Sequence, residues 1–246
     1  FRLLLWSLKE NSGGLIKIDF RLRRSDGTYR WFELEGASVE QSERRALKCV
    51  GILKDVTSIK RAQERLVHDA VHDSLTGLPN RELFLDRLGQ ALARSRSDNG
   101  ARPTALFIDI DRFKSVNSTF GLIVGDSLLL TVARRLSRHL GPHDTLARVG
   151  GDQFAILLTD QHDARQIALL AERIRRALRS PLKISGREVV LTGSIGIAVH
   201  DGQDAAHENL LREAEIAAFR AKRAGMDRIE IFKPSMRRES DEHVLL

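Results

Sequence analysis

The chain has 246 residues, of which 42% are hydrophobic, and its formal net charge is +7. This length suits one large or two modest domains, and the absence of any run of about 18 apolar residues argues against a membrane-spanning segment. The single cysteine, Cys49, excludes an internal disulfide and fits a cytoplasmic location. The basic excess indicates an anionic partner. Few aromatics, and arginines spread along the predicted helices, argue against nucleic acid and favour a small phosphate-bearing molecule.

The first part of the chain predicts a helix end at 1–11 and then three strands, at 15–23, 29–39 and 46–56. The turn signal Ser25-Asp26-Gly27-Thr28 separates the first two strands. A generic three-stranded sheet is one interpretation of this pattern.

The same stretch resembles the C-terminal half of a PAS sensor domain. The resemblance rests on the run from Phe20 to Trp31, on Val50-Gly51-Ile52 and on Asp55-Val56-Thr57. About 57 residues match, so no ligand pocket is inferred. We assign residues 1–57 to this partial domain.

Residues 58–73 predict a polar helix with a narrow apolar seam formed by Ile59, Ala62, Leu66 and Val67. That spacing is typical of a parallel coiled-coil dimer, which predicts a signalling linker and a homodimer. A helix packed on its own domain is the alternative.

His68 and His72 lie four residues apart in this helix, as the ligands of a zinc site would. The intervening acid is Asp69 rather than the Glu of a metalloprotease, and no third ligand is evident. Solvated or capping histidines are the better interpretation.

The stretch from Asp73 to Arg81 predicts a turn into a helix capped by Asn80. An apolar strand at 104–111 then ends in Asp109 and Asp111, which are costly to bury unless paired, solvated or bound to a cation. Two adjacent glycines, Gly150 and Gly151, predict a β-hairpin that carries Asp152. If the strand and the hairpin are sheet neighbours, Asp109 and Asp152 suit Mg²⁺, which binds one or two carboxylates together with phosphate oxygens. A plain hairpin with a solvated Asp152 is the alternative.

A short helix and loop at 113–125 and a longer helix at 126–140 follow the acidic strand. Asn117 and Asp126 together could recognise a guanine, because an amide and a carboxylate complement its carbonyl and N–H groups. The alternative for Asp126 is a helix cap. Further along, the pattern predicts helices at 163–178 and 207–224, a strand at 188–199 interrupted by Gly193 and Gly196, and a last strand at 229–232.

Four ordered motifs make the second part of the chain resemble a GGDEF domain, the diguanylate cyclase family. They are Asp-Ser-Leu-Thr-Gly-Leu-Pro-Asn-Arg from Asp73, Asp-Ile-Asp-Arg-Phe-Lys-Ser-Val-Asn from Asp109, Gly-Gly-Asp-Gln-Phe from Gly150, and Ala-Lys-Arg-Ala-Gly from Ala221. The resemblance implies an α+β fold, with a mixed, largely antiparallel sheet flanked by helices and related to nucleotide cyclase and polymerase palm domains. We assign residues 74–233 to this domain and 234–246 to a tail.

The resemblance also implies residue roles. Asp109, the carbonyl of Ile110 and Asp152 would bind Mg²⁺, and Asp152 would help to activate the 3′-hydroxyl of GTP. Asn117 and Asp126 would hold the guanine. The remaining substrate contacts would come from the phosphate-binding residues Phe113, Lys114 and Lys222 and from the hairpin glycines Gly150 and Gly151. Two such subunits, each with one GTP, would face each other to form cyclic di-GMP.

The chain departs from the family pattern at several of these positions. Gln153 stands where the signature has Glu and cannot supply a carboxylate to a second metal ion. Ser118 replaces an Asp and Leu122 replaces a His. Met226 and Asp227 replace Arg and Asn, and an acid beside a triphosphate should weaken its binding. The inhibitory product site needs Arg-x-x-Asp but has Gly-Pro-His-Asp at 141–144, so product inhibition there is not expected.

These features predict a cyclic di-GMP signalling protein whose degenerate GGDEF domain binds GTP and Mg²⁺ with weak or no cyclase activity. The alternatives are an active diguanylate cyclase that tolerates Gln153 and a dimerising relay without catalysis. The chain begins without Met, and its tail is of the type that leads into an EAL phosphodiesterase domain in many family members. We therefore expect a piece of a PAS–GGDEF–EAL protein, in which this domain regulates its neighbour.

Overall fold

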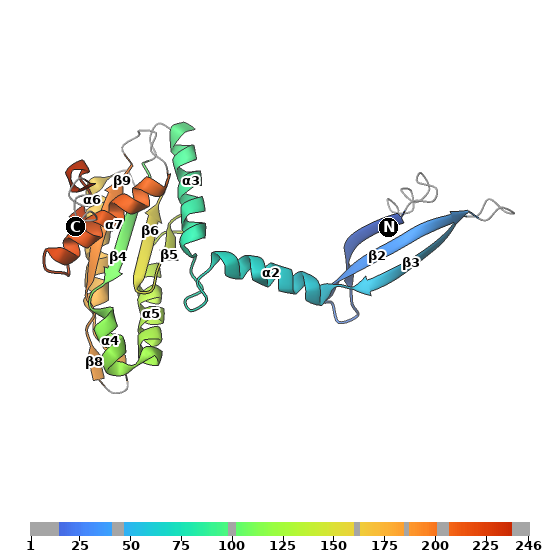
Figure 1. Cartoon of the computed structure of the whole chain (residues 1–246), viewed down its shortest axis with the longest axis horizontal. Helices are drawn as coiled ribbons and strands as arrows, with labels where there is room; N and C mark the ends of the chain where they lie inside the picture. Colours follow the sequence, from blue (N-terminus) through green and yellow to red (C-terminus); the bar gives the residue numbers. More distant parts are fainter. Residues whose placement is uncertain are drawn as a thin grey trace, which may run out of the picture. The chain divides into compact units, whose positions relative to one another are not determined.

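The computed structural model describes residues 15–40, 47–97, 102–159, 163–184, 187–200 and 207–237 (Figure 1). It contains two compact units that divide between Ala70 and Val71. The helix end expected at 1–11 and the tail from 238 onward lie outside the described residues. Within the described part, no helix has the length and apolar character that crossing a membrane requires.

The first unit holds an antiparallel sheet with the strand order β1-β2-β3, as the alternating sequence pattern predicted. Its register pairs Phe20 with Phe32 and Leu34 with Leu53. Gly27 adopts a φ of 84°, which explains why the predicted turn needs glycine between the first two strands. The strands are β1 (Leu15–Arg23), β2 (Tyr29–Glu40) and β3 (Leu47–Asp55).

The helix α2 (Thr57–Val71) follows β3 and exposes its apolar seam. Ile59, Leu66 and Val67 are 47%, 70% and 68% exposed. Packing on the first unit therefore leaves the apolar seam largely uncovered.

The second unit is built on a five-stranded sheet with the order β10-β9-β4-β6-β5. The strand β10 runs parallel to β9 and the other pairs are antiparallel, which confirms the expected mixed, largely antiparallel sheet. The strands of this sheet are β4 (Thr104–Ile110), β5 (Thr145–Arg148), β6 (Gln153–Leu158), β9 (Gly193–Val199) and β10 (Ile229–Ile231).

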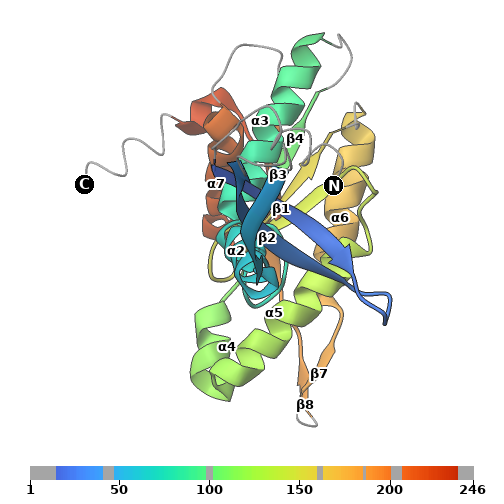
Figure 2. The ribbon, with the colours of Figure 1, turned by 90° about the vertical axis from the view of Figure 1, so that its right-hand side faces the viewer.

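Helices cover both faces of this sheet because successive residues of its central strands point to opposite sides. Leu106, Ile108 and Ile110 pack with α5 and α6, whereas Ala105 and Phe107 pack with α3 and α7. Figure 2 shows α3 and α7 on one side and α5 and α6 on the other. The helices are α3 (Arg81–Ser97), α4 (Phe113–Phe120), α5 (Leu122–Ser137), α6 (Ala164–Arg179) and α7 (His207–Arg223).

Two of the predicted boundaries are wrong. The helix α5 begins at Leu122 rather than Asp126, because Gly121, at a φ of 84°, ends α4 and the next helix starts immediately. Asp126 therefore lies inside α5 and does not cap it.

The strand predicted at 188–199 is also broken, into β8 (Arg187–Val189) and β9, and β8 pairs instead with β7 (Leu182–Ile184). Gly196 does not interrupt β9. A Cβ there would lie 2.0 Å from the carbonyl oxygen of Ala214, so glycine is needed to let α7 approach the sheet.

Candidate functional site

The acidic end of β4 lies directly beside the start of β6. The register pairs Asp109 with Gln153, so the strand and the diglycine hairpin are sheet neighbours, as the metal-site hypothesis required. Strand alternation places both side chains on the α7 face with Phe107. The amide Nε2 of Gln153 donates to Oδ2 of Asp109 over 3.4 Å.

Lys222 reaches the same carboxylate from the last turn of α7. Its Nζ atom donates to Oδ1 of Asp109 over 2.6 Å. The side chains of Lys222 and Asp109 are 31% and 17% exposed, so this ion pair is only partly hydrated. Asp109, Gln153 and Lys222 therefore form one contact group, although they come from three separate motifs.

Asp152 belongs to the same electrostatic environment. Burial raises the pKa of its carboxyl above the ordinary value, the negative charge of Asp109 raises it further, and Lys222 and Lys114 act in the opposite direction. Its backbone carbonyl accepts a hydrogen bond from the N–H of Ile110 over 3.2 Å, which ties the turn to the end of β4. A cation between the two carboxylates would relieve the repulsion that raises this pKa.

Asp111, the second acid of the strand, has a different environment. It is 5% exposed and accepts hydrogen bonds from the hydroxyls of Thr192 and Ser194, at 2.7 and 2.8 Å. The backbone N–H of Asp227 adds a third, at 3.0 Å. Asp111 thus joins β4 to β9 and to the loop before β10, and the cost of burying it is met by hydrogen bonds.

The two glycines of the hairpin are not needed for left-handed backbone, because neither is among the described residues with positive φ. A Cβ on Gly150 would instead lie 2.7 Å from Oε1 of Gln153. A Cβ on Gly151 would meet nothing within 4 Å, so the space beside it is open to another molecule. Gly150 thus leaves room for the side chain of Gln153, and Gly151 leaves the turn accessible to another molecule.

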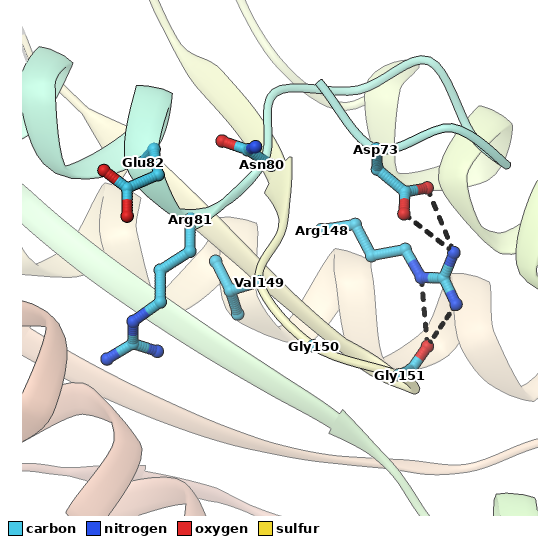
Figure 3. A pocket seen from close by; sticks show the side chains of 8 residues that line it. All are labelled: Asp73, Asn80, Arg81, Glu82, Arg148, Val149, Gly150 and Gly151. Carbon is cyan, nitrogen blue, oxygen red and sulfur yellow. Dashed lines mark hydrogen bonds and ion pairs between the residues drawn. The ribbon is translucent and has the colours of Figure 1, made fainter. Parts of the chain in front are cut away.

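Arg148 holds this turn in place (Figure 3). Its Nη1 donates to both carboxylate oxygens of Asp73 over 3.0 Å, and its Nε and Nη2 donate to the carbonyl of Gly151 over 3.0 and 2.6 Å. Asp73 also accepts hydrogen bonds from the N–H and hydroxyl of Thr76. Burial acts to raise the pKa of Asp73, but the bonds from Thr76 and Arg148 outweigh it and leave the pKa below its usual value.

A cavity of about 290 Å³ lies around this clamp. Its lining residues come from the Asp73 turn, the start of α3 and the hairpin (Figure 3). They are Asp73, Asn80, Arg81, Glu82, Arg148, Val149, Gly150 and Gly151.

The expected guanine-binding residues lie where α4 meets α5. The side-chain oxygen of Asn117 is buried and has no hydrogen-bond partner among the described residues. It faces Gly125, where a Cβ would lie only 1.9 Å away. Asp126 follows Gly125 and is exposed. An unpaired buried acceptor beside an exposed carboxylate suits a ligand that offers several N–H donors.

The residues expected to contact the phosphates lie on two helices, with Phe113 and Lys114 at the start of α4 and Lys222 near the end of α7. Phe113, which is 6% exposed, begins α4, and the first N–H groups of a helix attract anions. Lys114 is exposed and is close enough to Asp152 to lower its pKa.

Asp227, the acid expected to repel a triphosphate, is engaged in ion pairs with α6. Asp227 pairs with Arg175 over 3.1 Å and with Arg179 over 3.4 Å, both on α6. The expectation that Asp227 weakens substrate binding stays a prediction, and these arginines balance the charge on which it rests. Met226 remains apolar and supplies no cation.

The product-site segment forms a closed turn. Asp144 accepts a hydrogen bond from the N–H of Gly141 over 2.8 Å. Gly141 stands in the position of the arginine, so the absence of product inhibition at this segment stays a prediction.

The donor chemistry fits one hard cation. Asp109 and Asp152 supply carboxylates and Ile110 a carbonyl, and Mg²⁺ accepts such a partial set when phosphates and water complete it. In the described part of the chain, no three His, Cys, Asp or Glu side chains cluster as metal ligands, so the His68 and His72 zinc hypothesis gains no support. Gln153 offers an amide where a second cation would require a carboxylate.

Sequence reasoning missed two elements of the site, which are Gly125 and the Arg148–Asp73 clamp. A glycine inside a helical pattern is a usable signal of close approach. The clamp joins residues 75 positions apart, and only the fold reveals it.

Comparisons with known proteins identify the family of the second unit. A family model described as "Diguanylate cyclase, GGDEF domain" matches residues 70–228, more than half of the chain. The bifunctional diguanylate cyclase/cyclic di-GMP phosphodiesterase MucR of Pseudomonas aeruginosa is 39% identical over 190 residues, covering 77% of this chain and 27% of MucR. Diguanylate cyclase TpbB of the same species is 39% identical over 159 residues, covering 64% of this chain and 36% of TpbB. The chain thus spans only a part of these relatives.

Solved structures show the same fold. The GGDEF domain of TpbB superposes with a TM-score of 0.66 at 34% identity, covering 69% of this chain and 99% of that one. The coiled coil and GGDEF domain of DgcB from Caulobacter crescentus, in complex with c-di-GMP, gives a TM-score of 0.65 at 29% identity, covering 72% of this chain and 93% of that one.

Proposed function

The chain belongs to the family of diguanylate cyclase GGDEF domains, and from this premise we propose that its second unit binds GTP with Mg²⁺ and has weak or no cyclase activity. The bound state would regulate an adjoining output domain. The buried, unpaired Oδ1 of Asn117 carries the binding part of this proposal, since it needs a donor that guanine supplies.

Different residues would contact the base, the phosphates and the metal ion of bound GTP. Asn117 and Asp126 meet the base, and the start of α4 with Lys114 meets the phosphates. Asp109, Asp152 and the carbonyl of Ile110 hold the metal. When bound, Mg²⁺ would align the 3′-hydroxyl and neutralise charge on the triphosphate.

The proposal of weak or absent cyclase activity rests on Gln153. Its amide donates to Asp109 instead of adding a carboxylate, so the site has one negative charge fewer than a GGDEF sequence with Glu would give. Met226 likewise supplies no cation to the phosphates. The site thus lacks the negative charge of a Glu at position 153 and the positive charge of an Arg at position 226. Their absence should slow the cyclisation step more than it weakens GTP binding.

Two measurements test the proposal. Calorimetry with GTP and Mg²⁺ should show binding, and product chromatography should show little or no cyclic di-GMP. A Gln153→Glu variant should gain turnover without a large change in GTP affinity. Rapid formation of cyclic di-GMP by the unmodified chain would favour an active cyclase, and no binding at all would leave the non-catalytic relay.

The wider context is also a proposal. The first unit would be the C-terminal part of a PAS domain, and one similar structure is titled a sensory box/GGDEF family protein from Caulobacter crescentus, at 34% identity and a TM-score of 0.59. The exposed seam of α2 would pair with a second copy in a coiled coil. An EAL domain would follow the chain, which the bifunctional name of MucR supports. The full reading frame would test this arrangement directly.

A further inference from the structure

Both carboxylate oxygens of Asp109 are engaged by donors from the chain itself. Lys222 lies 2.6 Å from Oδ1, and the amide of Gln153 lies 3.4 Å from Oδ2. The ion pair is partly buried, so it is stronger than a fully exposed surface pair. The ammonium of Lys222 therefore occupies an oxygen that a hard cation would need.

The backbone around Lys222 is held while its side chain can rotate. The N–H of Met226 donates to the carbonyl of Ala221 over 3.3 Å. The next residue, Asp227, is fixed by Asp111 and by Arg175. Release of Asp109 then requires only a change of rotamer in a flexible lysine stem.

Resting on the proposed function, we propose that Lys222 is an internal counter-ion that makes cation binding conditional on the triphosphate. Lys222 neutralises Asp109 in the nucleotide-free protein. The triphosphate of GTP attracts its ammonium, and Oδ1 of Asp109 then becomes free for the cation. Cation and nucleotide affinities are thereby coupled, and such coupling acts equally in both directions.

Gln153 reinforces the effect. A glutamate at this position would add a negative charge that attracts a cation without help from the nucleotide. The amide instead donates to the carboxylate that Lys222 neutralises. The nucleotide-free site thus has little net attraction for a divalent ion.

Mn²⁺ alone, titrated by calorimetry or electron paramagnetic resonance, tests this role without nucleotide. Lys222→Gln should bind Mn²⁺ about tenfold more tightly than the unmodified chain. Lys233→Gln is the matched control, because it removes an equal charge from an exposed lysine after β10 that belongs to neither the proposed metal site nor the phosphate contacts. Its affinity should change by about threefold or less. Equal gains in both variants, or no gain in Lys222→Gln, would overturn the proposal.

A non-hydrolysable GTP analogue tests the coupling. Mn²⁺ should raise the analogue's affinity for the unmodified chain about tenfold or more, and by less in Lys222→Gln. Failure of the unmodified chain to bind the analogue would contradict the proposed function, while the titration with Mn²⁺ alone would still decide the role of Lys222. Thermal unfolding checks the fold, and Lys222→Met, which keeps the aliphatic stem, serves if Lys222→Gln is unstable.

Discussion

Asp109 and Gln153 stand directly opposite each other on β4 and β6, and their side chains share the α7 face of the sheet. The pairing brings together the two motifs that the proposed metal site requires. It also shows how the replacement of Glu by Gln acts. The amide of Gln153 donates a hydrogen bond to the carboxylate that we propose as a metal ligand.

Gly125→Ala should abolish guanine binding and leave the fold intact. The added Cβ would lie 1.9 Å from Oδ1 of Asn117 and would displace that side chain. Alanine in α5 should otherwise favour the helix by about 0.5–1 kcal/mol. Calorimetry with GTP and thermal unfolding separate the two effects. Retained GTP affinity at an unchanged melting temperature would show that Asn117 does not read the base.

Asp227→Asn should not improve GTP binding. Asparagine tolerates the φ of 48° at this position and keeps the N–H bond to Asp111, but it loses the ion pairs with Arg175 and Arg179. We expect a stability loss of about 1–2 kcal/mol in chemical denaturation. GTP affinity should change by less than about twofold. A gain of about tenfold would mean that the acid does face the triphosphate.

Arg148→Gln should destabilise the second unit by about 2 kcal/mol at neutral pH, below the roughly 3–5 kcal/mol of a fully buried pair. The pKa of Asp73 is lowered in the folded state, so its contribution is present above the unfolded pKa and is lost as the pH falls through the folded pKa. Denaturation curves of the variant and the unmodified chain should therefore converge in acid.

Arg81→Gln is the matched control for Arg148→Gln. Arg81 lines the same cavity but is exposed at the start of α3. Its replacement should cost about 0.5 kcal/mol or less. Equal losses in the two variants would show that the clamp contributes nothing specific.

Asp152→Asn should stabilise the protein at pH values above the folded-state pKa of Asp152. The pKa of Asp152 is raised by burial and by Asp109, so the contribution of its protonated form is lost as the pH rises through the folded pKa. The gain from Asn should shrink as the pH falls. A gain of about 1 kcal/mol would raise Tm by about 2–4 °C. Thermal scans that start below the ordinary aspartate pKa of 3.8 and extend to neutral pH measure it, and a pH-independent shift would contradict this cause.

Local patterns predicted most of this fold because hydrophobic period and turn residues determine it. Alternation located β1 to β3, and the apolar run before Asp109 located β4. The predicted start of α5 was wrong because Gly121 ends α4 and α5 begins at the next residue. No side chain caps the start of α5, so the sequence carries no cap signal there. The β7–β8 hairpin was missed because its strands have only three residues each.

The site was predictable as a set of residues but not as a set of contacts. The residue pattern indicated Asp109, Asp152 and Asn117, and the resemblance to GGDEF domains indicated Lys222. Neither indicated that Lys222 pairs with Asp109 or that α6 neutralises Asp227, because both contacts join distant segments. Side-chain direction at such positions depends on tertiary packing.

Calorimetric titration of the chain with GTP in the presence of Mg²⁺, with ATP as the comparison and product chromatography of the same sample, tests the central claim most directly. We predict saturable GTP binding at least about tenfold tighter than ATP binding, with little or no cyclic di-GMP formed. Equal affinity for the two nucleotides, or no binding of either, would contradict the claim.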